Sequence, residues 1–378
     1  MRKRKALWLA VALLLPALAL TQTPSRSDAV ALEQQGKWNE AAQIWQALIE
    51  KNPKDAEAFA HLGLLLSKEQ KYDQAVSAYK KAIQLNPAFP GVQLNLGLAE
   101  FKQGRLQEAV APFLAALTAD PSNLQARTLL GLSYYGTGRF AYAVEYLSPV
   151  AKSDPGNTEL HQVLAHSCLW AKKYPCALEE FHKIVQQNPD SAAAHMLNGE
   201  ALDGLGRTPE AIAEFEVAAK VAPREPNLNF GLGYLHWKLR QYDDAERYFE
   251  RELALDPGNA QALTYLGDVE MKRNNPERAL ALLRKAVQLR DDIRIAHVDL
   301  GSILAQQGQN QEAIAALQRA VKLDPAQPDA HFRLGRVYQA MGNSAAAQKE
   351  FATVRELHQK AEEDLTSKMS PSPSSPHP

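Results

Sequence analysis

Apolar residues recur every three or four positions along most of the chain, in pairs of stretches separated by short polar breaks. In residues 56–89, Leu62 and Leu66 lie one turn apart in the first stretch, and Ala75 and Tyr79 lie one turn apart in the second. This spacing is typical of amphipathic α-helices. The same arrangement returns every 34 residues, so the pattern predicts a series of helical hairpins without strands.

Three columns of residues mark the period. Prolines recur at Pro53, Pro87, Pro121, Pro155, Pro189, Pro223, Pro257 and Pro325. Glycines follow ten positions later, at Gly63, Gly97, Gly131, Gly199, Gly233, Gly267, Gly301 and Gly335. Alanines follow twelve positions after that, at Ala75, Ala109, Ala143, Ala177, Ala211, Ala245, Ala279, Ala313 and Ala347. We expect the glycine and alanine columns to face each other within a hairpin, and the prolines to end the second helix.

A large residue also stands four positions after the alanine, as in Tyr79, Phe113, Phe181, Phe215 and Phe249. Together with the three columns, it resembles the tetratricopeptide repeat family. The resemblance covers roughly residues 22–361 and implies an all-α fold, an α-solenoid of about ten 34-residue helix-turn-helix repeats in a right-handed superhelix. Its first helices would form a concave face. The expected repeats are residues 22–55, 56–89, 90–123, 124–157, 158–191, 192–225, 226–259, 260–293, 294–327 and 328–361.

The two ends of the chain depart from the repeat. Residues 2–5 are basic, residues 6–20 are apolar, and Ala17 and Ala19 offer a small-x-small cleavage site. This layout predicts a secretion signal over residues 1–21 and an exported protein of the periplasm or cell envelope. The alternative is an uncleaved segment that anchors the chain in a membrane. Residues 362–378 are rich in Ser and Pro towards their end, and we expect them to form a disordered tail.

Charge and motifs argue against several function classes. Lys and Arg number 42 against 43 Asp and Glu, so we expect no nucleic-acid partner, and membrane contact only through the signal segment or a partner complex. No phosphate-binding loop, zinc-protease motif or nucleophile elbow occurs. Histidines at one repeated position, such as His161 and His195, lie on successive hairpins, too far apart to share a metal ion. We therefore expect no enzyme activity, no cofactor and no metal site.

Two local features carry further expectations. Cys168 and Cys176 lie on opposed helices of one hairpin, and helices packed 8–10 Å apart on general grounds make a bond between them marginal, so we expect two free thiols. Pro112 and Pro149 lie within predicted second helices and should kink or shorten them.

Apolar side chains are also predicted on the face of the first helices that points away from the second helices. The candidate partner-binding residues are Leu94, Leu98, Phe101, Leu132, Tyr135, Met196, Phe230, Tyr234 and Trp237. They predict a groove for a peptide or helical segment, although some could instead pack against the next first helix. If the Trp237 ring faces the groove, Trp237→Ala should weaken partner capture and leave the melting temperature nearly unchanged.

These observations favour a non-catalytic protein-interaction scaffold. Two alternatives remain open: a non-catalytic subunit of an envelope export or assembly complex, and a repeat module associated with an enzyme.

Overall fold

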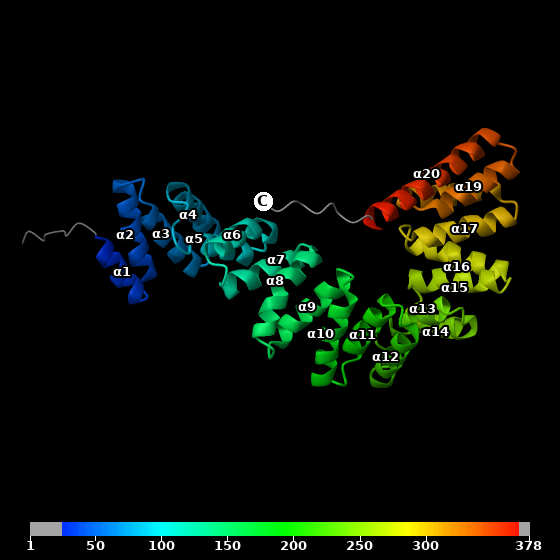
Figure 1. The fold of residues 1–378 in the computed structure, drawn as a ribbon, viewed down its shortest axis with the longest axis horizontal. Helices are drawn as coiled ribbons and strands as arrows, with labels where there is room; N and C mark the ends of the chain where they lie inside the picture. The colour runs from blue at the N-terminus through cyan, green and yellow to red at the C-terminus, as the bar shows by residue number, and fades with distance from the viewer. Residues whose placement is uncertain (1–24, 370–378) are drawn as a thin grey trace, which may run out of the picture. The chain divides into compact units, whose positions relative to one another are not determined.

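The structure is a computed structural model that describes residues 25–369, and it contains twenty helices and no strands within that range. Consecutive helices pair as hairpins, and each hairpin stacks on the next within its part of the chain (Figure 1). The predicted all-α fold of about ten helix-turn-helix repeats is confirmed. The signal segment predicted over residues 1–21 lies outside the described residues.

The chain divides into two compact units, residues 1–155 and residues 156–378. The first unit holds four hairpins, formed by α1 (Arg26–Gln34), α2 (Trp38–Lys51), α3 (Ala56–Lys68), α4 (Tyr72–Leu85), α5 (Val92–Lys102), α6 (Leu106–Ala119), α7 (Leu124–Gly136) and α8 (Phe140–Ser153).

The second unit holds six hairpins. They are formed by α9 (Thr158–Trp170), α10 (Tyr174–Gln187), α11 (Ala192–Gly204), α12 (Thr208–Val221), α13 (Leu228–Lys238), α14 (Tyr242–Leu255), α15 (Ala260–Lys272), α16 (Pro276–Leu289), α17 (Arg294–Gln306), α18 (Asn310–Leu323), α19 (Pro328–Ala340) and α20 (Ser344–Met369).

Close packing of the two helices explains the glycine column. A Cβ atom added at Gly233 would lie 2.7 Å from ring atoms of Phe249, which is fully buried. At Gly199 the added atom would meet both the Phe215 ring, at 2.6 Å, and the backbone oxygen of Ala211, at 3.2 Å. The glycine therefore accommodates the large residue of the second helix as well as the backbone of the column alanine.

The turn inside each hairpin requires one residue in the left-handed conformation, and glycine adopts it without steric cost. Gly104, for example, has a φ of 73°. Hairpins without a glycine at this point still adopt the conformation, with φ of 60° at Gln70 and 59° at Arg240. The turn geometry is therefore kept by the packing of the hairpin even where the residue disfavours it.

The two interior prolines do not shorten their helices. Pro112 lies in α6 and Pro149 in α8, and each helix spans 14 residues, as α4 does. A proline removes one backbone donor. Buried neighbours on the same helices, Phe113 and Leu147, are anchored in the packing and keep each helix continuous. The helices are therefore not shortened, and the expected kink stays a prediction.

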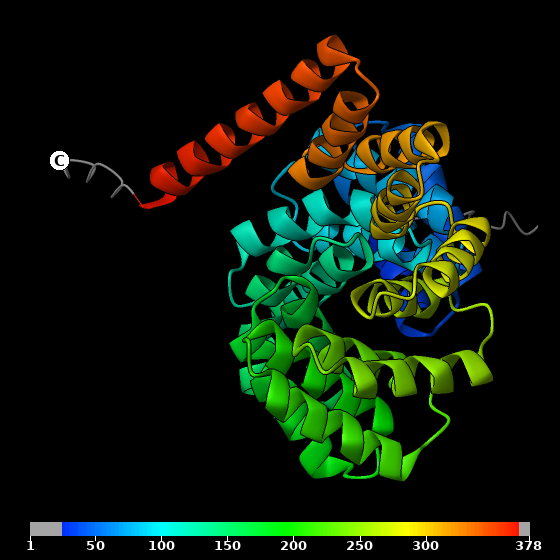
Figure 2. The same cartoon turned by 90° about the vertical axis from the view of Figure 1, so that its right-hand side faces the viewer.

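The last helix is longer than the repeat requires. In Figure 2, α20, coloured red, extends well beyond α19, coloured orange, against which its first part packs. The helix continues to Met369, because no proline interrupts the chain before Pro371. The prediction of a disordered tail is therefore wrong for residues 362–369, and residues 370–378 lie outside the described residues. No helix of the described residues is both long and apolar enough to cross a membrane.

Candidate functional site

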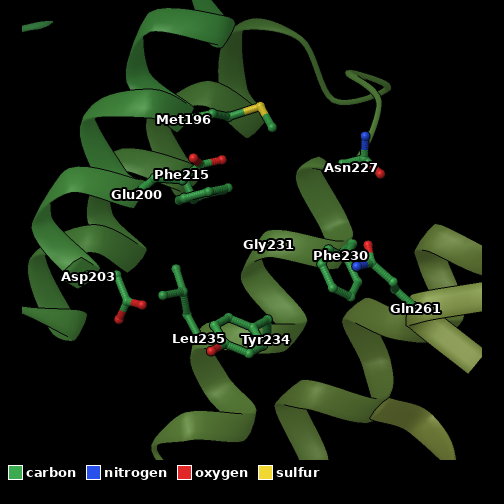
Figure 3. A pocket seen from close by; sticks show the side chains of 10 residues that line it. All are labelled: Met196, Glu200, Asp203, Phe215, Asn227, Phe230, Gly231, Tyr234, Leu235 and Gln261. Atoms are coloured by element: carbon green, nitrogen blue, oxygen red, sulfur yellow. The ribbon is translucent and has the colours of Figure 1, made fainter. Parts of the chain in front are cut away.

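The second unit contains a pocket of about 420 Å³ between α11 and α13, which we call the α11/α13 pocket (Figure 3). Three of the predicted partner-binding residues meet there: Met196 from α11, and Phe230 and Tyr234 from α13. The remaining lining residues are Glu200, Asp203, Phe215, Asn227, Gly231, Leu235 and Gln261. In Figure 3, Met196, Glu200 and Phe215 face Phe230, Asn227 and Gln261 across the opening.

The absence of a side chain at Gly231 helps to form this pocket. A Cβ atom added at Gly231 would lie 2.2 Å from the Phe215 ring, so only glycine allows the ring to lie against α13. The helix α13 also begins late, at Leu228, after Asn227 in the left-handed conformation with φ of 61°. The preceding Pro226, which lies outside the proline column, is the sequence signal that could have indicated this irregular start.

Two carboxylates on α11 lie on the wall of the α11/α13 pocket in different surroundings. Asp203 accepts hydrogen bonds from Lys238 Nζ at 2.5 Å and Thr208 Oγ1 at 2.8 Å. Glu200 has no hydrogen-bond or ion-pair partner among the described residues. Its side chain is exposed, and the residues around it still desolvate the carboxylate enough to raise the pKa of Glu200.

Trp237 does not line the pocket. Its ring is half-buried, lies 5.0 Å from the Tyr265 ring in an edge-on contact, and stacks on Tyr234 at 5.8 Å. Its indole N–H donates to Asp268 Oδ2 at 2.7 Å. The ring also packs against the core cluster around Phe249. These contacts differ from those of a free groove anchor, and we now expect Trp237 to contribute to the stability of its unit.

The interpretation of the sequence missed Tyr265, Asp268 and Asp299 on the neighbouring first helices. Burial raises the pKa of Tyr265 to about 12. Burial, and to a lesser extent the charge of Asp268, raises the pKa of Asp299 to about 7. The Oδ2 atom of Asp299 is buried and has no hydrogen-bond partner in the described part of the chain. A signal was present, because Asp268 occupies the repeat position held by Leu98 in the third hairpin.

The predicted residues of the first unit do not gather at one site. Leu98 lines a smaller pocket of about 320 Å³ between α3 and α5, the α3/α5 pocket, whose wall also carries Lys68 and Lys102. Phe101 lies edge-on to the Phe113 ring at 6.5 Å. Tyr135 lies edge-on to the ring of Phe140, Leu94 and Leu132 are half-buried, and none of these three lines the α3/α5 pocket.

The tetratricopeptide repeat profile matches residues 29–88, 62–124, 96–158, 164–226 and 230–293. The chain belongs to the tetratricopeptide repeat family. Related repeat profiles match residues 301–342 and 329–361. No curated protein matches the chain in sequence.

Several solved structures match the chain in a comparison of folds. The Cut9–Hcn1 hetero-tetramer of the APC/C matches with a TM-score of 0.53 and 16% identity, over 87% of this chain and 79% of that chain. Yeast Tom70 matches with a TM-score of 0.45 and 14% identity, over 90% and 92%. YrrB, a TPR protein described as having an unusual peptide-binding site, matches with a TM-score of 0.40 and 24% identity, over 51% and 100%. The first of these supports the shared fold and nothing finer.

Histidine–glutamate hydrogen bonds join the two helices of several tetratricopeptide hairpins. The pairs are His161 with Glu180, His195 with Glu214, and His331 with Glu350, each joining the first helix to the second. The other ring nitrogen of His195 lies 3.0 Å from the backbone oxygen of Pro189, which precedes the same helix. These contacts give the histidines a structural role. Among residues 25–369, no group of three His, Cys, Asp or Glu side chains could hold a metal ion.

One tetratricopeptide hairpin is closed by a disulfide. Cys168 and Cys176 are bonded, with Cα atoms 5.7 Å apart, so the expectation of two free thiols is wrong. The general distance between helix axes does not apply to these two residues, because they flank the hairpin turn and face each other. The equivalent position pair is also joined in other hairpins, by stacked rings 5.1 Å apart at Tyr134 and Tyr142 and by an ion pair of 2.8 Å at Glu270 and Arg278.

Proposed function

We propose that this chain is a non-catalytic scaffold that binds a peptide or helical segment of a protein partner in the α11/α13 pocket. Stacked tetratricopeptide hairpins fit protein–protein interaction in general, and arrays of this kind are typically non-catalytic. The proposal adds the place of binding and the kind of segment that binds.

The α11/α13 pocket is the observation that carries the proposal. Its apolar wall, which includes Met196, Phe230 and Tyr234, surrounds about 420 Å³. Burying a partner's apolar side chain there would contribute about 1.5–3 kcal/mol. Asn227 and Gln261 also line the pocket, and the exposed side-chain amide of Gln261 can both donate a hydrogen bond to a partner backbone and accept one from it. Apolar walls with a few polar groups are typical of binding sites.

Photo-crosslinking in the organism that makes the protein tests the place of binding. A photoreactive phenylalanine analogue at Met196 should crosslink to a defined partner. The matched control places the analogue at Leu289, an apolar residue that is 47% exposed at the end of α16 and away from the pocket. Met196→Asp should abolish binding of the same partner while the helical content stays unchanged. Equal crosslinking at both positions, or a partner retained by Met196→Asp, would overturn the proposal.

We also propose that the protein is exported to the periplasm or cell envelope. The basic residues 2–5 before the apolar residues 6–20 support this, and so does the Cys168–Cys176 disulfide, since disulfides persist in oxidising compartments. Intact-mass measurement on protein from the envelope should show the loss of about 19 to 21 residues. Full-length protein recovered from the cytosol would contradict export, and full-length protein in the membrane would indicate an uncleaved anchor.

Export leaves a second candidate function open, a non-catalytic subunit of an envelope export or assembly complex. The same crosslinking experiment separates the two candidates. A partner that crosslinks at Met196 and fractionates as an integral membrane complex favours the second function. A partner in the soluble fraction favours the free scaffold.

A further inference from the structure

The α11/α13 pocket contains one carboxylate without a partner and one that is already neutralised. Asp203 is held by Lys238 and Thr208. Lys238 therefore already has an ion-pair partner, because its Nζ atom lies 2.5 Å from Asp203 Oδ1. Glu200 shares the wall with Met196 and Phe215 and has no counter-ion among the described residues.

The first helix beyond α13, which is α15, also brings no cation to the pocket. On α15, the pocket residue is the neutral Gln261. The basic residue of α15 is Lys272, and its Nζ atom lies 3.8 Å from Asp268 Oδ1. Asp268 and Asp299 are two further buried carboxyl groups on first helices of this unit, and they bring no positive charge. The free pocket is therefore short of positive charge.

Binding of an apolar segment without a positive charge would cost free energy at Glu200. An apolar side chain that enters the pocket displaces water from the surroundings of Glu200, and an ionised carboxylate is destabilised when it is desolvated without a partner. In the free chain, desolvation by the surrounding residues already raises the pKa of Glu200, and the exposed carboxylate still has water to lose on binding. A cation supplied by the bound segment would offset this cost and add a charge-assisted hydrogen bond. An acidic neighbour on the segment would add repulsion.

We infer that the α11/α13 pocket selects a protein segment in which an apolar anchor residue is accompanied by a lysine or arginine that pairs with Glu200. This inference rests on the proposed function and specifies the chemistry of the partner. The anchor would contact Met196, Phe230 and Tyr234, and the basic side chain would reach the α11 wall on which Glu200 lies.

A peptide selection on the purified full chain tests the inference. A phage library of random 12-residue peptides is selected on the wild type, and peptides that Met196→Asp no longer binds are kept as pocket-dependent. These peptides should carry Lys or Arg within four residues of an aromatic or aliphatic residue. The affinity of the best peptide should fall about tenfold with Glu200→Gln, and Glu216→Gln, an exposed carboxylate of α12 outside the pocket, should leave it unchanged.

A charge swap shows whether the two groups act on each other. Replacing the basic residue of the peptide by Gln should also weaken binding about tenfold, and the two losses should not add. Glu200→Lys should bind a peptide whose basic residue is replaced by Glu better than it binds the original peptide. Melting curves confirm that each variant is folded.

The outcomes separate the inference from the proposed function. Pocket-dependent peptides without an excess of basic residues, or a Glu200→Gln variant that binds them as tightly as the wild type, would overturn the inference and leave the proposed function standing. A selection that yields no pocket-dependent peptide would overturn both.

Discussion

Replacing Trp237 with phenylalanine separates the packing of its ring from the hydrogen bond of its indole. The variant keeps an aromatic ring beside Tyr234 and Tyr265 but removes the N–H that donates to Asp268 Oδ2 at 2.7 Å. Asp268 is only 7% exposed, so water cannot readily replace the lost donor. The variant therefore leaves a buried carboxylate oxygen without its partner.

The magnitude follows from that loss. A hydrogen bond to a charged group contributes about 1.5–3 kcal/mol. For a unit of this size, about 2 kcal/mol corresponds to a melting temperature lowered by roughly 4 to 8 °C. Trp237→Ala should cost more, because it also removes the ring contacts with Tyr265 and the core around Phe249. The sequence alone suggested instead that Trp237→Ala would leave the melting temperature nearly unchanged.

Circular dichroism melts of four proteins test the reasoning: the wild type, Trp237→Phe, Asp268→Leu and the double variant. Leucine is chosen because Leu64, Leu98 and Leu132 occupy the equivalent position in earlier hairpins. Removing both partners of a buried hydrogen bond can be nearly neutral, so the double variant should recover most of the stability lost in Trp237→Phe.

Trp38→Phe, at a ring that is 37% exposed, is the control and should shift stability by less than about 0.5 kcal/mol. A Trp237→Phe variant as stable as the wild type would refute the hydrogen-bond argument. A double variant no more stable than Trp237→Phe would show that the unpaired carboxylate is not the cause.

Three further predictions concern other parts of the fold. Asp299 has a folded-state pKa of about 7, above its ordinary value of 3.8, so the folded chain holds a proton that the unfolded chain releases, and stability should fall as pH rises from about 4 to 7. Asp299→Asn should therefore raise the unfolding free energy at pH 8, by at most about 4 kcal/mol, and change it little at pH 4 in urea titrations; a gain that is independent of pH would contradict this. Gly233→Ala should destabilise the chain by about 1–3 kcal/mol in the same assay, because the new Cβ atom would lie 2.7 Å from the buried Phe249 ring, and an unchanged midpoint would show that the ring can move aside. Alkylation after unfolding without reductant should label neither Cys168 nor Cys176, and both should react once a reductant is present; labelling without reductant would show that the bond is absent.

Much of the fold could be predicted from the sequence because its rules are local. The column residues Gly233 and Phe249 meet within one hairpin, and the spacing between them is the same in the hairpin of Gly97 and Phe113. The same small and large residues recur at the same spacing in most repeats, so the period can be recognised from the sequence without any distance. The disulfide is equally local, but a general spacing between helix axes does not predict it. Positions next to the turn lie closer together than the axes do, as the stacked rings of Tyr134 and Tyr142 show.

The candidate site was only partly predictable. The helical period places Met196, Phe230 and Tyr234 on the expected face, and the structure brings all three to the α11/α13 pocket. The same period places Trp237 on that face, yet its indole turns to Asp268 of the next hairpin. Spacing along one helix gives the direction of a side chain, and it does not say which group of a neighbouring helix receives it.

The sequence by itself determined the number and pairing of the helices, because turn residues and small residues act within about 34 positions of each other. Only the tertiary structure decided where a pocket opens and which charges inside it are satisfied. Gly231 makes room for Phe215 of the preceding hairpin, and Lys238 neutralises Asp203 while Glu200 is left without a partner. These contacts join successive hairpins, and their geometry depends on how one repeat stacks on the next, which the repeat period does not specify.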